Sequence, residues 1–184
     1  MTVTIHQPNF IPWYPFFQKM HQADLFIMLG YCQYEKNGYQ NRFYLDGFWN
    51  TLSIGRGLDR IREKEYLNPS YDWMKLKKRL YKYQGTLSEL DEYISKDLYT
   101  TNKLIIKHLA TKLNIDTPIV EDFPLEVSST ERLVALCKHY GATTYLAGQG
   151  GKDYLDESLF KKSGIEVKYQ DNLNRVHTLE YLTQ

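Results

Sequence analysis

An ionisable side chain at the end of the first apolar run is the first candidate for chemistry. His6 comes directly after the β-rich residues 2–5. The loop that follows contains Pro8 and Pro12, which fix φ and lack a backbone donor. An imidazole held at a strand end by such a loop has the restricted motion that a general base or a ligand-orienting donor requires. A histidine that caps local backbone groups is the alternative.

Amide and ammonium groups lie close to His6 in the sequence. Gln7 and Asn9 are candidates to donate hydrogen bonds to a carbonyl or phosphate oxygen, or else to satisfy the backbone of a turn. Lys19 is suited to pair with a phosphate or a carboxylate, although most helix lysines are solvated. We therefore assign His6, Gln7 and Asn9 to catalysis and Lys19 to substrate binding.

Two further segments are suited to hold an anion. Asn41 places an amide beside the planar guanidinium of Arg42, whose shape fits phosphate or carboxylate. Cross-strand pairing of Arg42 with Asp46 or Glu35 is the alternative. Residues 148–153 (Gly-Gln-Gly-Gly-Lys-Asp) combine flexible backbone amides with the expected start of a helix. This segment lacks the spacing of a Walker A loop and of the dinucleotide fingerprint, and a tight turn is its plain alternative.

The elements that must position these groups begin with a βαβ unit. Residues 2–5 and 24–29 are expected as strands, and residues 13–22 between them as a helix with an apolar face. A parallel pair of strands requires a crossover of this kind. Because open α/β sheets bind ligands outside the carboxyl ends of their strands, His6 and Gln7 fall at the expected ligand corner.

A hairpin and a helical segment are expected next. Residues 39–45 and 48–54 flank an Asp-Gly pair, the strongest short hairpin signal in the chain, and this pair of strands is a candidate to extend the sheet in antiparallel fashion. Residues 61–66 are a candidate further strand. The helical insertion over about residues 70–115 is expected to contain helices 71–83 and 102–113, with Thr86 and Glu89 as a capping box.

The last third of the chain returns to βαβ order. The expected elements are a helix over residues 130–139, a strand over 143–147, a helix from the glycine-rich segment through Leu159, and a strand over 165–169. Ser128 and Glu131 have capping-box spacing, and that structural role accounts for them. We expect an α/β fold in a single domain over residues 1–184: a Rossmann-like, mostly parallel sheet with flanking helices, an antiparallel hairpin and a helical insertion.

Composition and charge exclude several classes of protein. The chain has 23 Lys and Arg against 22 Asp and Glu, which gives no field to attract polyanions, so no nucleic-acid partner is expected. Cys32 and Cys137 match no metal or redox spacing and are expected as free thiols in a reducing, cytoplasmic compartment. No apolar run has the length or flanks of a signal peptide or a membrane span, so neither secretion nor membrane insertion is expected. No His or Cys pair has metal-ligand spacing, so no metal is expected.

The chain also carries an ordered series of motifs along nearly its whole length. They are Ile5-His6-Gln7-Pro8-Asn9-Phe10-Ile11-Pro12-Trp13, Lys19, Asp24, Gln33, Tyr39-Gln40-Asn41-Arg42, Ser129-Thr130-Glu131-Arg132-Leu133, Tyr145-Leu146-Ala147-Gly148, Gly151, Tyr154-Leu155-Asp156 and Gly164-Ile165. This series resembles the WbqC-like family. The resemblance implies a bacterial cytoplasmic protein, often encoded beside O-antigen or other glycan genes, that transfers glycine or another acyl group to a sugar. The family commonly has an acidic pair after its second strand, whereas this chain has Gly30-Tyr31.

The resemblance and the chemistry above together give a set of candidate substrate-binding residues. They are Lys19, Gln33, Asn41, Arg42, Gly148, Gln149, Gly150, Gly151, Lys152 and Tyr154. The strand that leads to His6 and the Gly-Lys-Asp-Tyr stretch at 151–154 also resemble pantothenate synthetase and related adenylate-forming enzymes. This likeness implies that ATP or a nucleotide-linked substrate lies between His6 and the glycine-rich segment.

The leading hypothesis is an acyl or aminoacyl transferase that acts on a sugar or nucleotide sugar in bacterial surface polysaccharide biosynthesis. His6 would deprotonate the attacking amine or hydroxyl, and Gln7 and Asn9 would orient the carbonyl. Two alternatives stay open: a non-catalytic protein that binds a nucleotide sugar or a partner, and an ATP-dependent adenylate-forming ligase. The expected partner is a small molecule, no cofactor is required, and a nucleotide or acyl-CoA is a candidate substrate. The oligomeric state is left open.

Overall fold

The centre of the fold is a five-stranded parallel sheet. The computed structural model describes residues 1–57, 59–171 and 173–183. Across the sheet the strands are β5 (Ile119–Glu121), β2 (Leu25–Met28), β1 (Thr2–His6), β6 (Thr144–Ala147) and β7 (Glu166–Tyr169). Numbered within the sheet along the chain, this is the Rossmann order 3-2-1-4-5. The predicted α/β fold with a mostly parallel sheet is confirmed, and β5 is an additional strand that was not predicted.

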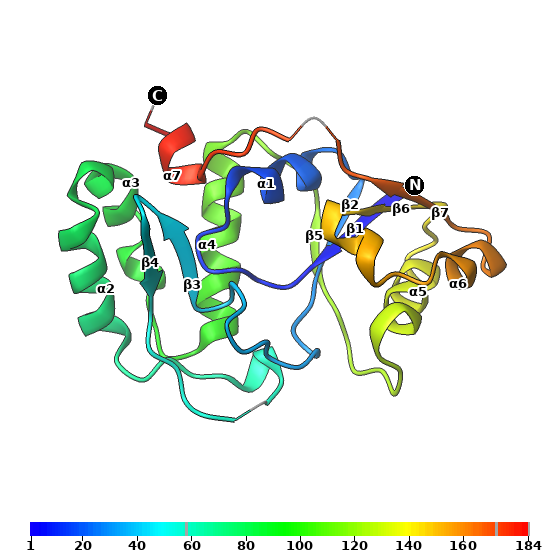
Figure 1. The fold of residues 1–184 in the computed structure, drawn as a ribbon, viewed down its shortest axis with the longest axis horizontal. Coiled ribbons are helices and arrows are strands. Elements are labelled where there is room, and N and C mark those ends of the chain that lie inside the picture. Colours follow the sequence, from blue (N-terminus) through cyan, green and yellow to red (C-terminus); the bar gives the residue numbers. More distant parts are fainter. Residues whose placement is uncertain (58, 172, 184) are drawn as a thin grey trace.

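Helices cover both faces of this sheet (Figure 1). The helices are α1 (Tyr14–His21), α2 (Pro69–Arg79), α3 (Gln84–Ser88), α4 (Leu98–Lys112), α5 (Ser129–His139), α6 (Glu157–Lys162) and α7 (Thr178–Tyr181). Short 3₁₀ turns occupy Ile61–Glu63, Tyr81–Tyr83, Asp91–Tyr93 and Gln149–Asp153. Helices α1 and α4 lie on one face of the sheet and α5 and α6 on the other, so the central strands β2, β1 and β6 are buried from both sides.

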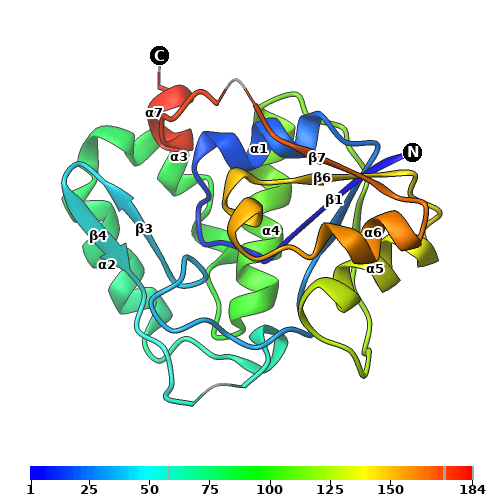
Figure 2. The ribbon, with the colours of Figure 1, turned by 45° about the vertical axis from the view of Figure 1, so that its right-hand side comes forward.

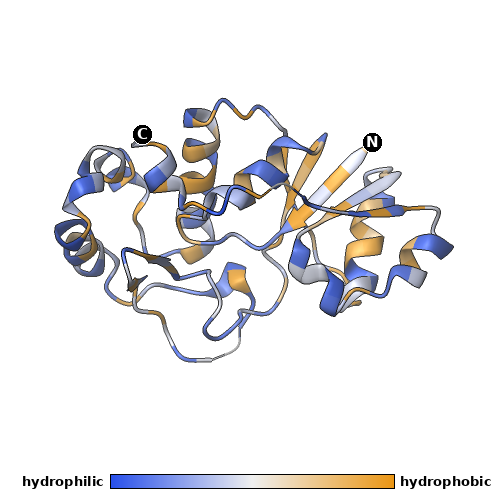
Figure 3. Cartoon of the chain, turned by 45° about the horizontal axis from the view of Figure 1, so that its top comes forward, coloured by the Kyte–Doolittle hydropathy of each residue, from blue (hydrophilic) through white to orange (hydrophobic). Residues whose placement is uncertain are grey.

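The period of two in the strands decides which face each side chain joins. In β2, Phe26 and Met28 belong to the apolar cluster that contains α1 and α4, whereas Ile27 joins the cluster that contains α5 and α6. In β1 the same alternation directs Ile5 to the second cluster and His6 to the α1 face, where its ring meets the ring of Phe16. Figure 3 shows the apolar colour concentrated along the central strands. The alternation of side chains along β1 thus determines the face of the sheet on which His6 lies.

The hairpin forms where it was predicted but not in the sheet that was expected. Strands β3 (Arg42–Leu45) and β4 (Phe48–Thr51) make a separate two-stranded sheet. Asp46 and Gly47 both have positive φ, at 55° and 82°, as a tight hairpin turn requires. The expectation that this pair extends the main sheet is wrong, because its buried side chain Phe43 packs in the cluster that also contains Trp73 of α2.

Three local predictions are corrected by the structure. Residues 61–66 form a 3₁₀ turn with isolated bridges rather than a strand, because their backbone pairs singly with neighbouring segments, as in the bond from the Ile61 amide to the Cys32 carbonyl. Thr86 lies inside α3 and therefore cannot be an N-cap. Ser128 does occupy the N-cap of α5, but its side chain makes no capping hydrogen bond.

The glycine-rich segment also differs from its prediction. It forms the 3₁₀ turn Gln149–Asp153, and a new helix, α6, begins only at Glu157, where the Asp156 side chain accepts a hydrogen bond from the Ser158 amide. The prediction of one helix from the glycine-rich segment through Leu159 is therefore wrong. The cysteines behave as expected, since Cys32 and Cys137 are both free thiols.

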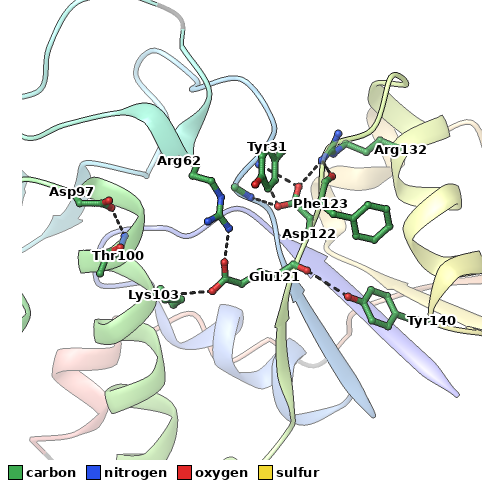
Figure 4. A network of polar contacts seen from close by, with 11 residues as sticks. Tyr31, Arg62, Asp97, Thr100, Lys103, Glu121, Asp122, Phe123, Arg132 and Tyr140 are labelled. Carbon is green, nitrogen blue, oxygen red and sulfur yellow. Dashed lines mark hydrogen bonds and ion pairs between the residues drawn. The ribbon is translucent and has the colours of Figure 1, made fainter.

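A buried carboxylate ties the end of β5 to the end of β2 (Figure 4). Asp122 accepts hydrogen bonds from the backbone amides of Gly30 at 2.7 Å and Tyr31 at 3.2 Å. Its other oxygen accepts from the Arg132 guanidinium at 2.6 Å, and this ion pair is buried on both sides. An acidic side chain thus lies at the end of β2, but it comes from the residue that follows β5 rather than from positions 30 and 31.

Gly30 sits where no larger residue fits. A Cβ atom at Gly30 would lie 2.7 Å from the Tyr99 ring and 3.1 Å from Nε of Arg62. We expect Gly30→Ala to lower the free energy of unfolding by about 1–3 kcal/mol, because overpacking forces a shift of the rings around it. Urea unfolding monitored by circular dichroism checks this. The matched control is Gly85→Ala, at which a Cβ meets nothing within 4 Å, and equal stability of the two variants would contradict the prediction.

The C-terminal segment runs back over α1 and ends beside the hairpin (Figures 1 and 2). We call residues 173–177 the C-terminal strap. The Val176 carbonyl accepts a hydrogen bond from the Tyr14 amide at 3.1 Å, and Thr178 donates its hydroxyl to the Pro12 carbonyl at 2.6 Å. The ring of Tyr181 in α7 stacks on that of Tyr14 with centroids 3.9 Å apart. These contacts hold the strap against the loop that follows β1.

Candidate functional site

A cavity of about 570 Å³ opens between the loop after β1, the hairpin and the C-terminal strap. Its lining comes from residues 9–13, residues 43–46 and residues 175–177, together with His6, Tyr39 and Glu180. The volume lies in the range of small-molecule sites, which are mostly apolar with a few placed polar groups. We call this space the aromatic cavity, after the rings of Phe10, Trp13, Tyr39, Phe43 and Tyr44 that line it.

His6 reaches the aromatic cavity from the end of β1. Its Nδ1 lies 2.9 Å from the Gln7 carbonyl oxygen, and because a carbonyl only accepts, this contact places the ring hydrogen on Nδ1. Nε2 then carries the lone pair, and it forms no hydrogen bond with the described residues. Burial, the nearby charge of Lys19 and the bond to Gln7 together leave the pKa of His6 at about 3, with burial the largest cause. The imidazole is therefore neutral at neutral pH.

Lys19 is the buried cation beside this imidazole. The Lys19 side chain extends from helix α1 toward the carboxyl end of β1. It is only 3% exposed there, and its Nζ donates to the Ile5 carbonyl at 3.4 Å. Burial lowers the pKa of Lys19 to about 7. The structure therefore brings the predicted residues Lys19 and His6 together at the carboxyl end of β1. Lys19 itself does not line the aromatic cavity.

Replacing this lysine tests the coupling between the two groups. Folded Lys19 holds its proton less tightly than the unfolded chain, whose lysine pKa is near 10.5, so the unfolded state binds more protons above pH 7 and stability rises with pH. We expect Lys19→Met to weaken this rise between pH 7 and about pH 9 and to raise the pKa of His6, because the neighbouring charge is gone.

Urea unfolding at the two pH values and an NMR titration of the histidine rings measure the two effects. Lys161→Met, in which an exposed lysine is lost, serves as the control. An unchanged His6 pKa in Lys19→Met would contradict the electrostatic coupling.

Gln7 and Asn9 take different positions. The Gln7 amide donates to Sγ of Cys32 at 3.7 Å, and its oxygen accepts from the Gln40 amide, so Gln7 is tied to the neighbouring segment. Asn9 is buried and lines the aromatic cavity together with His6. Asn102 of α4 fixes the loop by donating to the carbonyls of Pro8 and Gln40, both at 2.7 Å. Of the two amides, Asn9 is therefore the one placed beside the imidazole.

The hairpin residues lie around a second hollow. Asn41 and Arg42 line a space of about 650 Å³ away from His6. The Asn41 side chain accepts from the Tyr34 hydroxyl at 2.9 Å and donates to the Leu52 carbonyl at 2.8 Å, which is a structural role. Arg42 donates to the carbonyls of residues 37 and 38 and lies 4.0 Å from the centre of the Trp49 ring. Gln33 is exposed and pairs through its backbone with Arg60.

The glycine-rich segment follows β6, next to the end of β1 in the sheet but outside the aromatic cavity. Gln149 donates to the Gln170 carbonyl, and Gln170 in turn donates to the Pro15 carbonyl at 2.8 Å. Around Gly148 and Gly150 there is open space, whereas a Cβ at Gly151 would lie 2.9 Å from Leu155. Lys152 lies over the Tyr169 ring, and Tyr154 is largely exposed. The predicted site residues thus fall into three places rather than one.

The C-terminal wall of the cavity contains residues that were not predicted from the sequence. Arg175, His177 and Glu180 all line it. The missed signal is a capping box, in which His177 is the N-cap of α7 and the Glu180 carboxylate accepts from the His177 amide at 3.0 Å. Among the described residues no group of His, Cys, Asp and Glu gathers as metal ligands would. Within the same ranges, no helix has the length and apolar character needed to cross a membrane.

Comparisons with known proteins point to one family. The model of the WbqC-like protein family matches residues 7–181. An uncharacterised protein of Mycobacterium tuberculosis, Rv1507c, is 29% identical over 190 residues, which cover 92% of this chain and 81% of that protein. A solved structure, the Zn(II)-bound H205L variant of AdcAII from Streptococcus pneumoniae, covers 99% of this chain and 94% of its own at 15% identity, with a TM-score of 0.26 that supports no inference about fold or function.

Proposed function

Since the chain belongs to the WbqC-like protein family, we propose that it transfers an acyl or aminoacyl group to a sugar carried on a nucleotide, in the synthesis of bacterial surface polysaccharide. The observation that carries this proposal is the position of His6. It ends β1 beside β6, where the strand order reverses and where α/β proteins bind their ligands, and it lines a cavity of suitable size.

The proposed step is attack of a sugar amine or hydroxyl on the carbonyl carbon of a thioester donor. A C–N or C–O bond forms, the C–S bond breaks, and the proton released by the nucleophile passes through Nε2 of His6 to the departing thiolate. The Nδ1–H bond to the Gln7 carbonyl holds the imidazole in the tautomer that this transfer needs. Asn9 would donate to the carbonyl oxygen as negative charge develops there.

The negative charge of the substrate would raise the pKa of His6. An imidazole with a pKa of about 3 is a weak base in the free protein, and the best pKa for a general base lies near the working pH. The phosphates of a bound nucleotide would favour the charged forms of both Lys19 and His6 and so raise both pKa values. His6 would then be basic enough to accept the proton only when the substrate is bound.

A thermal-shift panel on wild type and His6→Ala tests the proposal. The panel contains nucleotides, nucleotide sugars, acyl-CoAs and ATP, since a ligand that binds only the folded state raises the unfolding midpoint. We expect shifts with nucleotide sugars and with acyl-CoAs, reduced in His6→Ala. A shift with ATP and no other ligand, followed by release of pyrophosphate with an acid, would replace the proposal with an adenylate-forming ligase.

A non-catalytic protein that binds a nucleotide sugar is the second candidate. The low pKa of His6 favours it, because such an imidazole binds ligands as a neutral polar group without taking up a proton. The two functions separate in one comparison. Tight binding of a nucleotide sugar with no product from any acyl donor supports the binding protein, whereas product formation excludes it.

A further inference from the structure

The second hollow, of about 650 Å³, lies at the end of the hairpin opposite to the turn at residues 46 and 47 (Figure 1). Its walls are the start of β3, the end of β4 and parts of the segments 34–37 and 54–57. It shares no lining residue with the aromatic cavity. A ligand held there would therefore be separate from the proposed transfer site.

The charges around this hollow are of one sign. Three cationic side chains line it, Lys36, Arg42 and Arg56, and no Asp or Glu is among its described lining residues. Lys36 and Arg56 are exposed, and neither forms an ion pair or a side-chain hydrogen bond with the described part of the chain. Because like charges repel one another, an anion that binds between them relieves an unfavourable interaction. We call this space the basic hollow.

A carboxylate beside the basic hollow is already neutralised. Asp59 lies next to Gly57, but its carboxylate pairs at 2.7 Å with the buried ammonium of Lys64, which lowers the pKa of Asp59. The Lys64 Nζ also donates to the carbonyls of Gly55 and Arg56, at 3.3 Å and 3.2 Å. One buried ammonium thus cancels the acidic charge and fixes the backbone of the wall that carries Arg56.

Arg42 is held in place in the opposite wall. Its Nε donates to the Gly38 carbonyl at 3.2 Å and its Nη2 donates to the Asn37 carbonyl. The guanidinium also lies 4.0 Å from the centre of the Trp49 ring. Within the described ranges, Nη1 forms no hydrogen bond. A planar guanidinium that is fixed through one edge keeps its other edge for parallel hydrogen bonds to an oxyanion.

The floor of the basic hollow is polar and neutral. Tyr34 and Asn41 are almost fully buried, and the Tyr34 hydroxyl donates to the Asn41 side chain at 2.9 Å. Burial raises the pKa of Tyr34, the charge of Arg42 lowers it, and the charge of Glu35 raises it by less than Arg42 lowers it. The net effect of these two charges at the floor is therefore that of a positive charge, as an anion site requires.

We propose that the basic hollow binds a small molecule through a phosphate or diphosphate group, with the outer edge of Arg42 donating to its oxygens and Lys36 and Arg56 balancing its remaining charge. A phosphate group offers several oxygens and more than one negative charge, which a fixed guanidinium and two mobile cations match. A nucleic acid is a poorer match, since the net charge of the whole chain is only +1. The inference goes beyond the proposed function, because it adds a second site that does not depend on acyl transfer.

Calorimetric titration of the full chain with sodium pyrophosphate, in buffer without divalent cations, tests the site. We expect Arg56→Gln and Lys36→Gln each to weaken binding about five- to tenfold, as loss of one contact between charged groups implies. Both side chains are exposed, so both variants should keep the unfolding midpoint of wild type. Lys161→Gln, which neutralises an exposed lysine of α6, is the control.

Arg42→Lys separates the planar guanidinium from its charge. Lysine keeps the positive charge but cannot form two parallel hydrogen bonds, so we expect pyrophosphate to bind about tenfold more weakly. The unfolding midpoint shows whether the lost bonds to the carbonyls of residues 37 and 38 also destabilise the fold. If they do, Lys36→Gln and Arg56→Gln, which leave those bonds intact, decide the assignment alone.

A uridine diphosphate sugar in the same titrations identifies the source of the phosphate. If Arg56→Gln weakens its binding as much as that of pyrophosphate, the basic hollow holds the diphosphate of a nucleotide sugar. If only pyrophosphate binding weakens, the basic hollow takes a separate phosphorylated ligand.

Two results would overturn the site, whether or not acyl transfer is observed. One is the absence of pyrophosphate binding by wild type. The other is an equal affinity for pyrophosphate in wild type, Lys36→Gln and Arg56→Gln. Pyrophosphate binding that depends on Arg56, in a protein that transfers no acyl group, supports the basic hollow and contradicts only the proposed function.

Discussion

Asp122→Ala is expected to lower the free energy of unfolding by about 3–5 kcal/mol, the effect of breaking a buried ion pair from one side. The Asp122 carboxylate is fully buried, and the Arg132 guanidinium on it is 8% exposed. Removing the carboxylate leaves this cation uncompensated and also frees the amides of Gly30 and Tyr31. Chemical denaturation monitored by circular dichroism measures the loss.

Two further variants identify the cause of this destabilisation. Asp116→Ala removes an exposed aspartate and should change stability little. The double variant Asp122→Ala/Arg132→Met removes the stranded charge and should recover part of the loss, since an unpaired buried charge is worse than none. Equal stability of the single and the double variant would mean that the loss of stability comes from the freed backbone amides rather than from the unpaired Arg132 charge.

His6→Gln is expected to reduce acyl transfer by about 10²–10⁴-fold, the usual contribution of a positioned general base. Glutamine preserves a neutral polar side chain of similar size but cannot take up the proton. Because the wild-type imidazole is already neutral at neutral pH, the variant should fold with little change in stability. Initial rates at saturating donor give the loss of turnover, and His21→Gln, which alters an exposed histidine at the end of α1, is the control.

An unaltered KM for the nucleotide sugar is also expected in His6→Gln, because glutamine, unlike alanine, keeps a neutral polar side chain of similar size there, and a general base acts on the transition state rather than on the bound sugar. A variant that binds less tightly but turns over at the wild-type rate would make His6 a binding residue rather than the base.

The sequence was sufficient to predict those helices and strands in which apolar residues recur with a clear period. The apolar runs of β1, β2, β6 and β7 and the amphipathic spacing of α1 and α5 led directly to their elements. Strand β5 has only three residues, all half-buried, and α7 has only four, so neither carries a readable period. The sheet to which β3 and β4 belong depends on long-range packing against α2, which no local pattern contains.

The same limit applies to the site. The strand, loop and helix signals around His6 were enough to place it with Lys19 at the end of β1, because spacing along α1 determines which side chains face the sheet. Arg42 was expected to be free for an anion, but its guanidinium turns to the carbonyls of residues 37 and 38, which depends on the turn geometry. His177 reaches the cavity only because the chain returns over α1, an event remote from its own sequence neighbours.

Mass spectrometry of the sugar product tests most directly whether the protein transfers an acyl group with His6 as the base. Wild type, His6→Gln and His21→Gln are incubated with isotope-labelled acyl and aminoacyl thioesters and a panel of nucleotide-linked amino sugars. We expect a sugar that gains the labelled acyl mass with wild type and His21→Gln, and a loss of that product in His6→Gln. Labelled product formed equally well by His6→Gln, or no labelled sugar from any donor despite tight binding of a nucleotide sugar, would contradict it.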